Sequence, residues 1–221
     1  IDERMGAYIQ RLLDCDPAEA KRVQKNHFHE HGTTLAGLMK EHGVDPHDFL
    51  DDVHAIPLDR VARDERLADA LARLPGRKFV FTNGDAPYAR RVLEAIGVDR
   101  HFDDLHVIHA SSYRPKPDPH GYALLCERFG IEPGHALLAD DMVQNLEPAQ
   151  ELAADRPDSA GRQVALGRAA GSHQGINAGA WDRRHQSAGD VAGGIEGDAR
   201  SSLEDRVDEL AVARLLQDEH G

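Results

Sequence analysis

The sequence has few cysteines and no long apolar run, and each shortage excludes a class of protein. Its two cysteines, Cys15 and Cys126, are spread over 221 residues, and neither lies in a Cys-x-x-Cys pair. Neither a disulfide framework nor a structural zinc site is therefore predicted. No apolar run approaches the roughly 20 residues that cross a bilayer, and no signal segment opens the sequence. We predict a cytoplasmic protein without a membrane partner.

Positive charge is also scarce in this chain. The 26 lysines and arginines stand against 39 aspartates and glutamates, which gives a formal net charge of -13. This balance disfavours general binding to nucleic acid or to anionic membranes, so we predict no nucleic-acid partner. The length suits one core of ordinary size with a smaller appendage. The sequence makes no prediction of the oligomeric state.

Residues 1–75 have the pattern of helices and contain no strand pattern. Apolar residues recur at helical spacing over 5–13, and Asp16-Pro17 supplies an N-cap followed by a proline at the first helical position. Further helices are predicted over 34–42, 46–53 and 65–74, the last of which ends before Pro75-Gly76. We predict that this region is a small all-helical domain.

Residues 76–152 repeat a strand, a polar loop and a helix three times. The predicted strands are 78–81, 105–110 and 136–139, and helices are predicted to begin near Pro87, near Pro119 and after Met142. Strands that alternate with helices form parallel sheets with right-handed crossovers. We therefore predict an α/β fold with a Rossmann-like core.

Residues 153–221 form a tail of different composition. Up to Arg200 the tail is rich in glycine, alanine, arginine, aspartate and serine, and we predict partial disorder there. A helix is predicted over 202–217, because Ser202 and Asp205 resemble a capping box ahead of apolar residues at helical spacing. The composition also fits an out-of-frame translation of a GC-rich gene, which is a hypothesis about the origin of the tail.

A polar segment follows each predicted strand of the core. These segments are Thr82-Asn83-Gly84, Lys116 between two prolines, and Asp140-Asp141. Ligands of open α/β sheets bind at the carboxyl ends of the strands, so we expect the three segments to share one site.

The chemistry of these residues suits a phosphate and a cation, although each residue also has a simpler interpretation. Adjacent carboxylates at Asp140 and Asp141 suit Mg²⁺, or one of them caps the next helix. The Lys116 ammonium, fixed in a stiff loop, could neutralise phosphate, or it is a solvated lysine in a turn. Thr82 could hold phosphate beside a helix start, or it belongs to an ordinary turn. The combination is more specific than any of its parts.

The amino-acid sequences of these segments resemble the motifs of a known superfamily. Phe81-Thr82-Asn83-Gly84, Arg114-Pro115-Lys116-Pro117 and Asp140-Asp141-Met142-Val143-Gln144-Asn145 resemble motifs II, III and IV of the haloacid dehalogenase (HAD) superfamily. Together with the helical region they look closest to the bacterial and fungal pyrimidine 5′-nucleotidase-like subgroup. The resemblance covers roughly residues 1–152.

The resemblance implies an HAD-like fold and Mg²⁺-dependent hydrolysis of a small phosphomonoester through an aspartyl-phosphate intermediate, with nucleoside monophosphates as candidate substrates. In this interpretation the segment Thr82-Asn83-Gly84 binds the phosphoryl group. Lys116 is a catalytic residue that also binds phosphate and balances its charge. Asp140 and Asp141 hold Mg²⁺, with Asp141 favoured as the direct ligand. Residues 1–75 are the cap that closes over the substrate.

The sequence departs from the superfamily in its first motif, an Asp-x-Asp segment that supplies the nucleophile and the general acid/base. Asp14-Cys15-Asp16 matches the Asp-x-Asp pattern, but it lies between two predicted helices. We therefore reject it as the first motif. We expect that the sequence is truncated at its N-terminus, in the gene prediction or in the expressed chain, and that the chain as printed has little or no turnover. A strand also expected after Leu152 is missing.

Three other interpretations stay open. The chain could be a dehalogenase of the same superfamily, a non-catalytic phosphate-binding or interaction module, or a fragment whose exposed strand edges prevent a unique fold. Separately, His27, His29 and His31 invite a metal site, because an i, i+4 histidine pair on a helix can chelate. With no acidic or thiol partner placed nearby in the sequence to complete it, a polar helix face is the favoured interpretation there.

Overall fold

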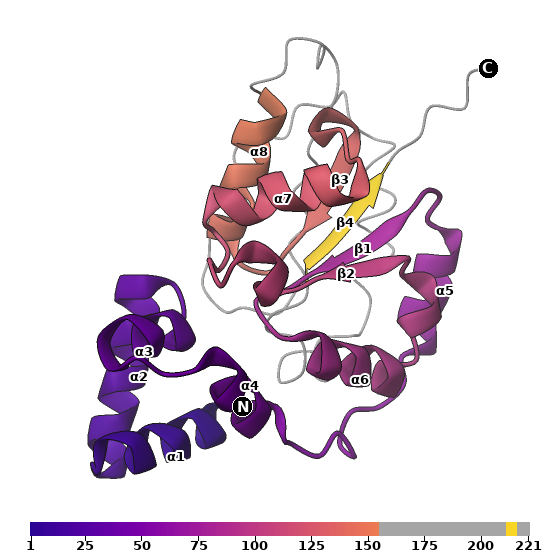
Figure 1. Ribbon diagram of the computed structural model, residues 1–221. Helices are drawn as coiled ribbons and strands as arrows, with labels where there is room; N and C mark the ends of the chain where they lie inside the picture. Colours follow the sequence, from indigo (N-terminus) through magenta and orange to yellow (C-terminus); the bar gives the residue numbers. More distant parts are fainter. Residues whose placement is uncertain (155–210, 216–221) are drawn as a thin grey trace, which may run out of the picture.

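The computed structural model describes residues 1–154 and 211–215, which form a helical segment beside an α/β unit (Figure 1). The helical segment consists of α1 (Asp2–Leu13), α2 (Pro17–His31), α3 (Thr34–His42) and α4 (Pro46–His54), and α5 (Glu65–Arg73) leads into the α/β unit. Asp16 caps α2 by accepting a hydrogen bond from the backbone N–H of Glu19, as its sequence pattern predicts. The helices predicted over 34–42, 46–53 and 65–74 are confirmed, and their ends differ from the prediction by at most one residue.

The sheet contains four strands, β1 (Lys78–Phe81), β2 (Asp104–His106), β3 (Ala136–Ala139) and β4 (Ala211–Leu215), in the order β2-β1-β4-β3. β1 and β2 are parallel, as predicted, whereas β4 lies antiparallel to both β1 and β3. The chain is therefore an α/β protein with a Rossmann-like core whose sheet is mixed rather than wholly parallel.

The predicted helix over 202–217 is wrong at 211–215, and its other residues lie outside the described ranges. β4 occupies the position between β1 and β3 and pairs with both. Without it, the facing edges of those two strands would leave backbone N–H and C=O groups unpaired. Pairing with two distant strands therefore overrides the local helical pattern. The predicted disorder over 155–210 also falls outside the described residues.

Three longer helices complete the α/β unit: α6 (Ala86–Ile96), α7 (Pro119–Phe129) and α8 (Glu147–Ala154). Short 3₁₀ turns connect the elements: η1 (Asp99–His101), η2 (Ile108–Ser111), η3 (Pro133–His135) and η4 (Val143–Asn145). The predicted strand 105–110 is too long, because the chain turns into η2 and the backbone N–H of Ala110 bonds to the carbonyl of Val107. The helix predicted after Met142 likewise begins only at Glu147.

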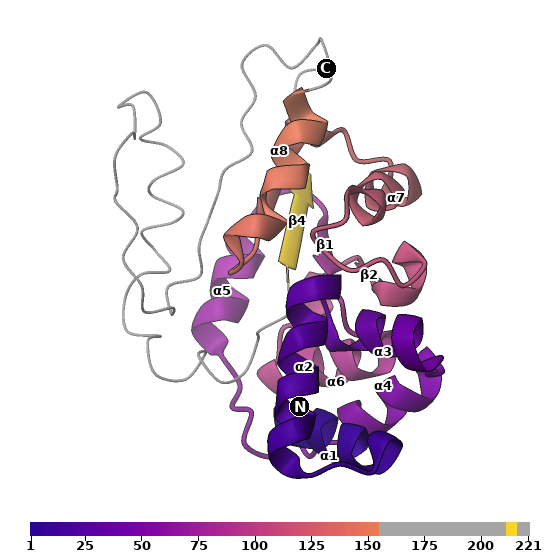
Figure 2. The same cartoon turned by 90° about the vertical axis from the view of Figure 1, so that its left-hand side faces the viewer.

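Alternate side chains of the strands pack against different helices, as the period of two residues in a strand requires. Val80 and Leu105 belong to a core cluster with α5 and α6. Phe79, Phe81 and Leu138 belong to a second cluster with α7 and α8. The sheet is thus covered by helices from both sides (Figure 1). A third cluster fills the helical segment, which lies at one end of the α/β unit in both views (Figure 2).

The junction between the helical segment and the α/β unit contains a buried hydrogen bond beside the start of α6. His54 Nδ1 of α4 lies 3.1 Å from Asp85 Oδ1, and the His54 ring stacks on Tyr88. Arg91 donates to the carbonyls of His54 and Ile56. Burial alone raises the pKa of Asp85, but hydrogen bonds from His54 and from the Tyr88 N–H lower the pKa below its ordinary value. α4 is therefore fixed directly beside the segment that follows β1.

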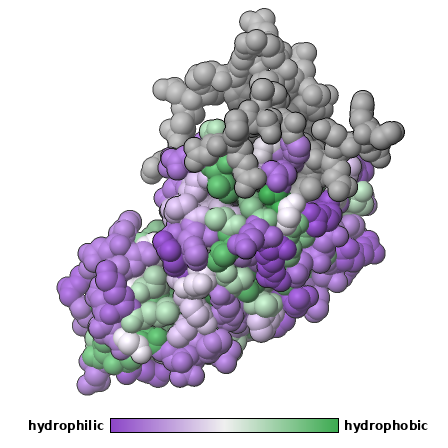
Figure 3. Space-filling view, turned by 45° about the horizontal axis from the view of Figure 1, so that its top comes forward, coloured by the Kyte–Doolittle hydropathy of each residue, from purple (hydrophilic) through white to green (hydrophobic). Residues whose placement is uncertain are grey.

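The coloured part of the face shown in Figure 3 is mostly hydrophilic, with apolar patches among the polar residues. Among the described residues, the large apolar side chains that are exposed are Leu12, Phe28 and Val143, which are far apart in the sequence. Single exposed apolar residues of this kind are ordinary. Within the described ranges, no helix combines the length and apolar character that crossing a membrane requires.

His106 predicts a measurable pH dependence of stability. Its side chain is 1% exposed, its Nε2 lies 3.0 Å from the Ser111 hydroxyl, and burial, with a contribution from Arg128, lowers its pKa to about 4. An unfolded histidine has a pKa near 6.5, so as the pH falls from about 6.5 to 4 the unfolded chain binds the proton first and the folded state loses up to roughly 3 kcal/mol.

His106→Gln can keep the bond to Ser111 and removes the titration. Urea unfolding at several pH values should therefore show a shallower loss of stability for this variant than for the wild type between pH 6.5 and 4. Parallel curves for the two proteins would show that His106 does not contribute as described.

Candidate functional site

A buried ion pair joins two of the polar segments at the carboxyl ends of the strands. Lys116 Nζ donates to Asp140 Oδ2 at 2.8 Å and to the Phe81 carbonyl at 3.1 Å. The two charged side chains are only 2% and 1% exposed. The interpretation of Lys116 as a solvated turn lysine is therefore wrong.

Asn83 positions the lysine from the other side. Its Oδ1 accepts a hydrogen bond from the Lys116 backbone N–H at 2.8 Å, and its Nδ2 donates to the Lys116 carbonyl at 3.4 Å. The side chain of a residue after β1 thus holds the backbone of a residue 33 positions later. The cis peptide bond between Lys116 and Pro117 lies within the same loop.

The carboxylate of Asp140 accepts hydrogen bonds at both oxygens. Oδ1 accepts from the Met142 backbone N–H at 3.0 Å and from Asn145 Nδ2 at 2.9 Å, while Oδ2 accepts from Lys116. Asp140 therefore does bond to the backbone that follows it, as the helix-cap interpretation expects, but it also neutralises a buried cation. These three donors offset much of the cost of burying the charge.

Asn145 and Tyr122 form a support behind Asp140 that sequence reasoning missed. The Tyr122 hydroxyl donates to the Asn145 carbonyl at 2.6 Å, and both side chains are buried. Burial raises the pKa of Tyr122, and the negative charge of Asp140 adds to the effect. Asn145 is the last residue of the Asp140–Asn145 motif, so the sequence pointed to this residue. Its bond to Asp140 could not be predicted, because the bond depends on the turn of η4.

Thr82 lies where β1 meets the start of α6. The residue is 3% exposed, its N–H donates to the His106 carbonyl, and its Oγ1 accepts from the Gly84 N–H at 2.9 Å. Thr82 therefore does belong to a turn, in which its hydroxyl accepts a hydrogen bond. Because the hydroxyl acts as acceptor in this bond, its own hydrogen can still donate to a ligand. Asp85 then caps α6 by accepting from the Tyr88 N–H.

The structure therefore brings Asn83, Lys116 and Asp140 into direct contact, with Thr82 and Gly84 in the turn beside Asn83. Asp141 follows Asp140 in the chain and is half-buried.

Asp14-Cys15-Asp16 lies in the turn between α1 and α2, away from the sheet. Asp14 adopts a left-handed conformation with φ of 48° at the end of α1, and Asp16 caps α2. These roles are structural, which agrees with our rejection of this segment as a catalytic motif.

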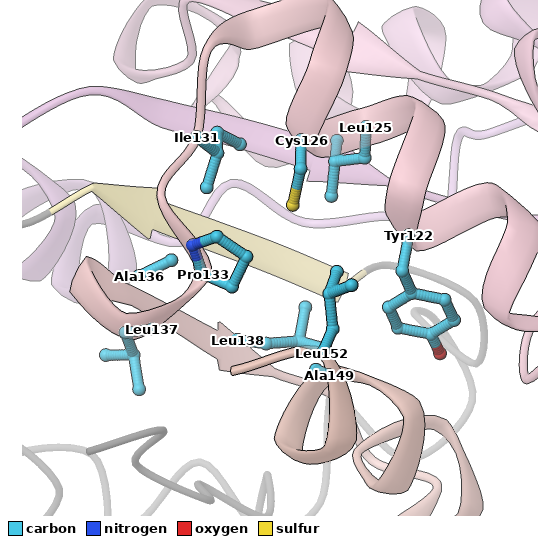
Figure 4. A pocket seen from close by; sticks show the side chains of 10 residues that line it. All are labelled: Tyr122, Leu125, Cys126, Ile131, Pro133, Ala136, Leu137, Leu138, Ala149 and Leu152. Carbon is cyan, nitrogen blue, oxygen red and sulfur yellow. The ribbon is translucent and has the colours of Figure 1, made fainter. Parts of the chain in front are cut away.

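An apolar cavity of about 40 Å³ lies among α7, η3, β3 and α8 (Figure 4). No charged side chain lines it. Its lining residues are Tyr122, Leu125, Cys126, Ile131, Pro133, Ala136, Leu137, Leu138, Ala149 and Leu152. The cavity is thus a packing gap in the core and offers none of the polar groups that the Lys116–Asp140 cluster presents.

Comparison with known proteins identifies the family of the chain. A family model of haloacid dehalogenase-like hydrolases matches residues 15–152, which is more than half of the chain. The chain belongs to this hydrolase family, and the recognition of the superfamily from its motifs is confirmed.

A particular relative is Phosphate metabolism protein 8 of Saccharomyces cerevisiae, which is 25% identical over 170 residues. The alignment covers 69% of this chain and 52% of the yeast protein, so the chain spans about half the length of that relative.

Proposed function

We propose that the chain carries the phosphate- and metal-binding part of a Mg²⁺-dependent phosphomonoester hydrolase, with nucleoside monophosphates as the candidate substrates and the pyrimidine 5′-nucleotidase-like subgroup as its place in the family. The observation that carries the proposal is the buried Lys116–Asp140 pair, which Asn83 holds against the carboxyl ends of the strands. Membership of a hydrolase family and similarity to a protein named for phosphate metabolism support it.

Lys116 retains a donor for a ligand in this arrangement. An ammonium group has three N–H donors, and two of them bond to Asp140 and to the Phe81 carbonyl. The third can bond to a phosphoryl oxygen or to the attacking carboxylate and so balance their negative charge. Lys116 thereby serves both of its proposed functions, in catalysis and in phosphate binding.

The turn after β1 would bind the phosphoryl group through other donors. The Thr82 hydroxyl can donate to a phosphoryl oxygen. Asn83 would contribute its backbone N–H, because both polar atoms of its side chain bond to Lys116. Gly84 would supply close backbone approach next to the start of α6, where the positive end of the helix dipole favours an anion.

Asp140 and Asp141 fit a magnesium ion as oxygen ligands, which Mg²⁺ prefers. Asp140 already accepts three hydrogen bonds, so it offers few further lone pairs, and Asp141 is the better candidate for the direct ligand. When bound, Mg²⁺ would neutralise charge that develops on the phosphoryl group. Asp140 would hold Lys116 in place and contribute negative charge that attracts the ion.

Hydrolysis through an aspartyl-phosphate also needs a nucleophilic aspartate, which the superfamily takes from its Asp-x-Asp motif. Among the described residues, no Asp-x-Asp segment is part of the cluster around Lys116. We propose that the chain as printed binds phosphate and Mg²⁺ with little or no turnover, that residues 1–75 act as the cap, and that the protein works in the cytoplasm. Release of phosphate from p-nitrophenyl phosphate that requires Mg²⁺ and disappears in Asp141→Ala would contradict the turnover part of this proposal.

Thr82→Val tests the phosphate-binding assignment. The substitution keeps the shape of the side chain and removes the hydroxyl, so a hydrogen bond to a charged phosphoryl oxygen worth about 1.5–3 kcal/mol is lost. Calorimetric titration with uridine monophosphate and Mg²⁺ should show at least about tenfold weaker binding. Thr34→Val is the matched control, because Thr34 is also buried but lies in α3 and bonds to the Gln24 carbonyl. Equal affinities of the Thr82 and Thr34 variants would refute the assignment.

Haloacid turnover that survives EDTA would instead favour the dehalogenase alternative, because that reaction does not depend on a metal.

A further inference from the structure

A cluster of histidine and glutamate side chains lies between α2 and α3, in the helical segment and outside the proposed phosphate site. His27 and His31 are one turn apart on α2, and Glu41 and His42 come from the last turn of α3. His31 Nε2 donates to Glu41 Oε1 at 2.7 Å, and His27 Nδ1 lies 3.7 Å from the same oxygen. The His27 ring neighbours those of His31 and His42, with centroids 5.8 and 5.7 Å away.

These separations are close to what a single metal ion needs. Zinc binds histidine nitrogen and carboxylate oxygen at roughly 2.0–2.2 Å, which places two donor atoms of a tetrahedral site about 3.4 Å apart. The ligand atoms of His27, Glu41 and His42 all lie within 4.8 Å of one another, as do those of Glu30, His31 and Glu41. Glu41 belongs to both groups, and it is joined by two histidines in the first group and by one in the second.

His27 supplies an independent sign of a missing partner. The residue is 4% exposed, and its Nε2 has no hydrogen-bond partner among the described residues. A buried ring nitrogen without a partner is costly, and a metal ion bound at Nε2 would compensate for that cost, whereas one bound at Nδ1 would not.

Gly37 of α3 makes room for the His27 ring. A Cβ atom at this position would lie 2.3 Å from His27 Cγ and 2.5 Å from its Nδ1. The absence of a side chain at Gly37 therefore allows the imidazole to enter the interface between the two helices. The local sequence of α3 is thus adapted to the buried histidine.

We propose that α2 and α3 form a binding site for a divalent transition metal ion such as Zn²⁺, with His27, Glu41 and His42 as the ligands. Imidazole nitrogen selects Zn²⁺ and its neighbours over Mg²⁺, so this site is distinct from the proposed magnesium site. The sequence hypothesis set a metal site aside because no acidic partner was placed nearby. Glu41 and His42 come from the next helix, where only the fold reveals them.

The test uses the full chain, stripped of metal with EDTA and then titrated with Zn²⁺ by calorimetry in excess Mg²⁺. We expect saturable binding of one equivalent of Zn²⁺, and a visible absorption band when Co²⁺ replaces Zn²⁺. His42→Ala and Glu41→Gln should each weaken binding by at least about tenfold, with the fold checked by circular dichroism. His29→Ala is the matched control, because His29 lies on α2 but is exposed and faces away from the cluster.

Several outcomes would overturn the proposal. They are no saturable Zn²⁺ binding by the wild type, unchanged affinity in both the His42 and the Glu41 variants, or an equal loss in His29→Ala. Retained Zn²⁺ affinity in Asp141→Asn separates this site from the proposed magnesium site, so either proposal can fail without the other. Loss of Zn²⁺ binding in Asp141→Asn alone would assign the ion to that other site and refute the present one.

Discussion

Replacing Lys116 with methionine should lower the free energy of unfolding by about 3–5 kcal/mol, because the change leaves the Asp140 carboxylate buried and without its cation. The lysine and aspartate side chains are 2% and 1% exposed, so water cannot take the place of the lost partner. Urea unfolding at neutral pH, followed by circular dichroism, measures the loss. A change below about 1 kcal/mol would mean that the pair is solvated after all.

Two further variants isolate the cause of this loss. The double replacement Lys116→Met with Asp140→Leu removes both charges and should recover much of the stability, since apolar residues often replace a buried pair without cost. Arg114→Met breaks an ion pair with Asp118 in the same loop, but there the side chains are 54% and 28% exposed. This control should cost at most about 1 kcal/mol.

Asp141→Asn should weaken Mg²⁺ binding at least about tenfold while changing stability little, because Asp141 is half-buried and is the proposed direct ligand. Asp140→Asn should instead lower stability as well, since it removes the partner of Lys116. Calorimetric Mg²⁺ titration and urea unfolding of both variants measure the two effects separately.

Asp51→Asn serves as the control for charge alone. Asp51 is exposed on α4 and, like Asp141, has an aspartate as its neighbour in the chain. Its replacement should leave Mg²⁺ affinity unchanged. If Asp141→Asn and Asp51→Asn behaved alike, the assignment of Asp141 as a metal ligand would be wrong.

Local signals predicted most of the helices because the residues that start and end them are neighbours in the sequence. Asp16-Pro17 starts α2 by a cap that spans three residues, and Gly97 ends α6 with φ of 87°. β4 was missed because its stability comes from pairing with β1 and β3, more than 70 positions earlier in the chain. No local pattern over 211–215 carries that information.

The candidate site shows the same division between local and distant information. The order of the three polar segments indicated Lys116 and Asp140, and the fold brings them together. The burial of Lys116 could not be predicted, because it depends on Asn83 holding the lysine backbone from 33 positions away. The histidine cluster was underestimated for the same reason, since Glu41 approaches His31 only when α2 packs on α3.

The most direct test of the central claim is the Mg²⁺ dependence of nucleotide binding by the full chain. Titration with uridine monophosphate should give saturable binding in Mg²⁺, at least about tenfold weaker binding in EDTA, and none with uridine, which lacks the phosphate. Equal affinity for uridine and uridine monophosphate, or equal affinity with and without Mg²⁺, would contradict the claim that the Lys116–Asp140 cluster binds phosphate and magnesium.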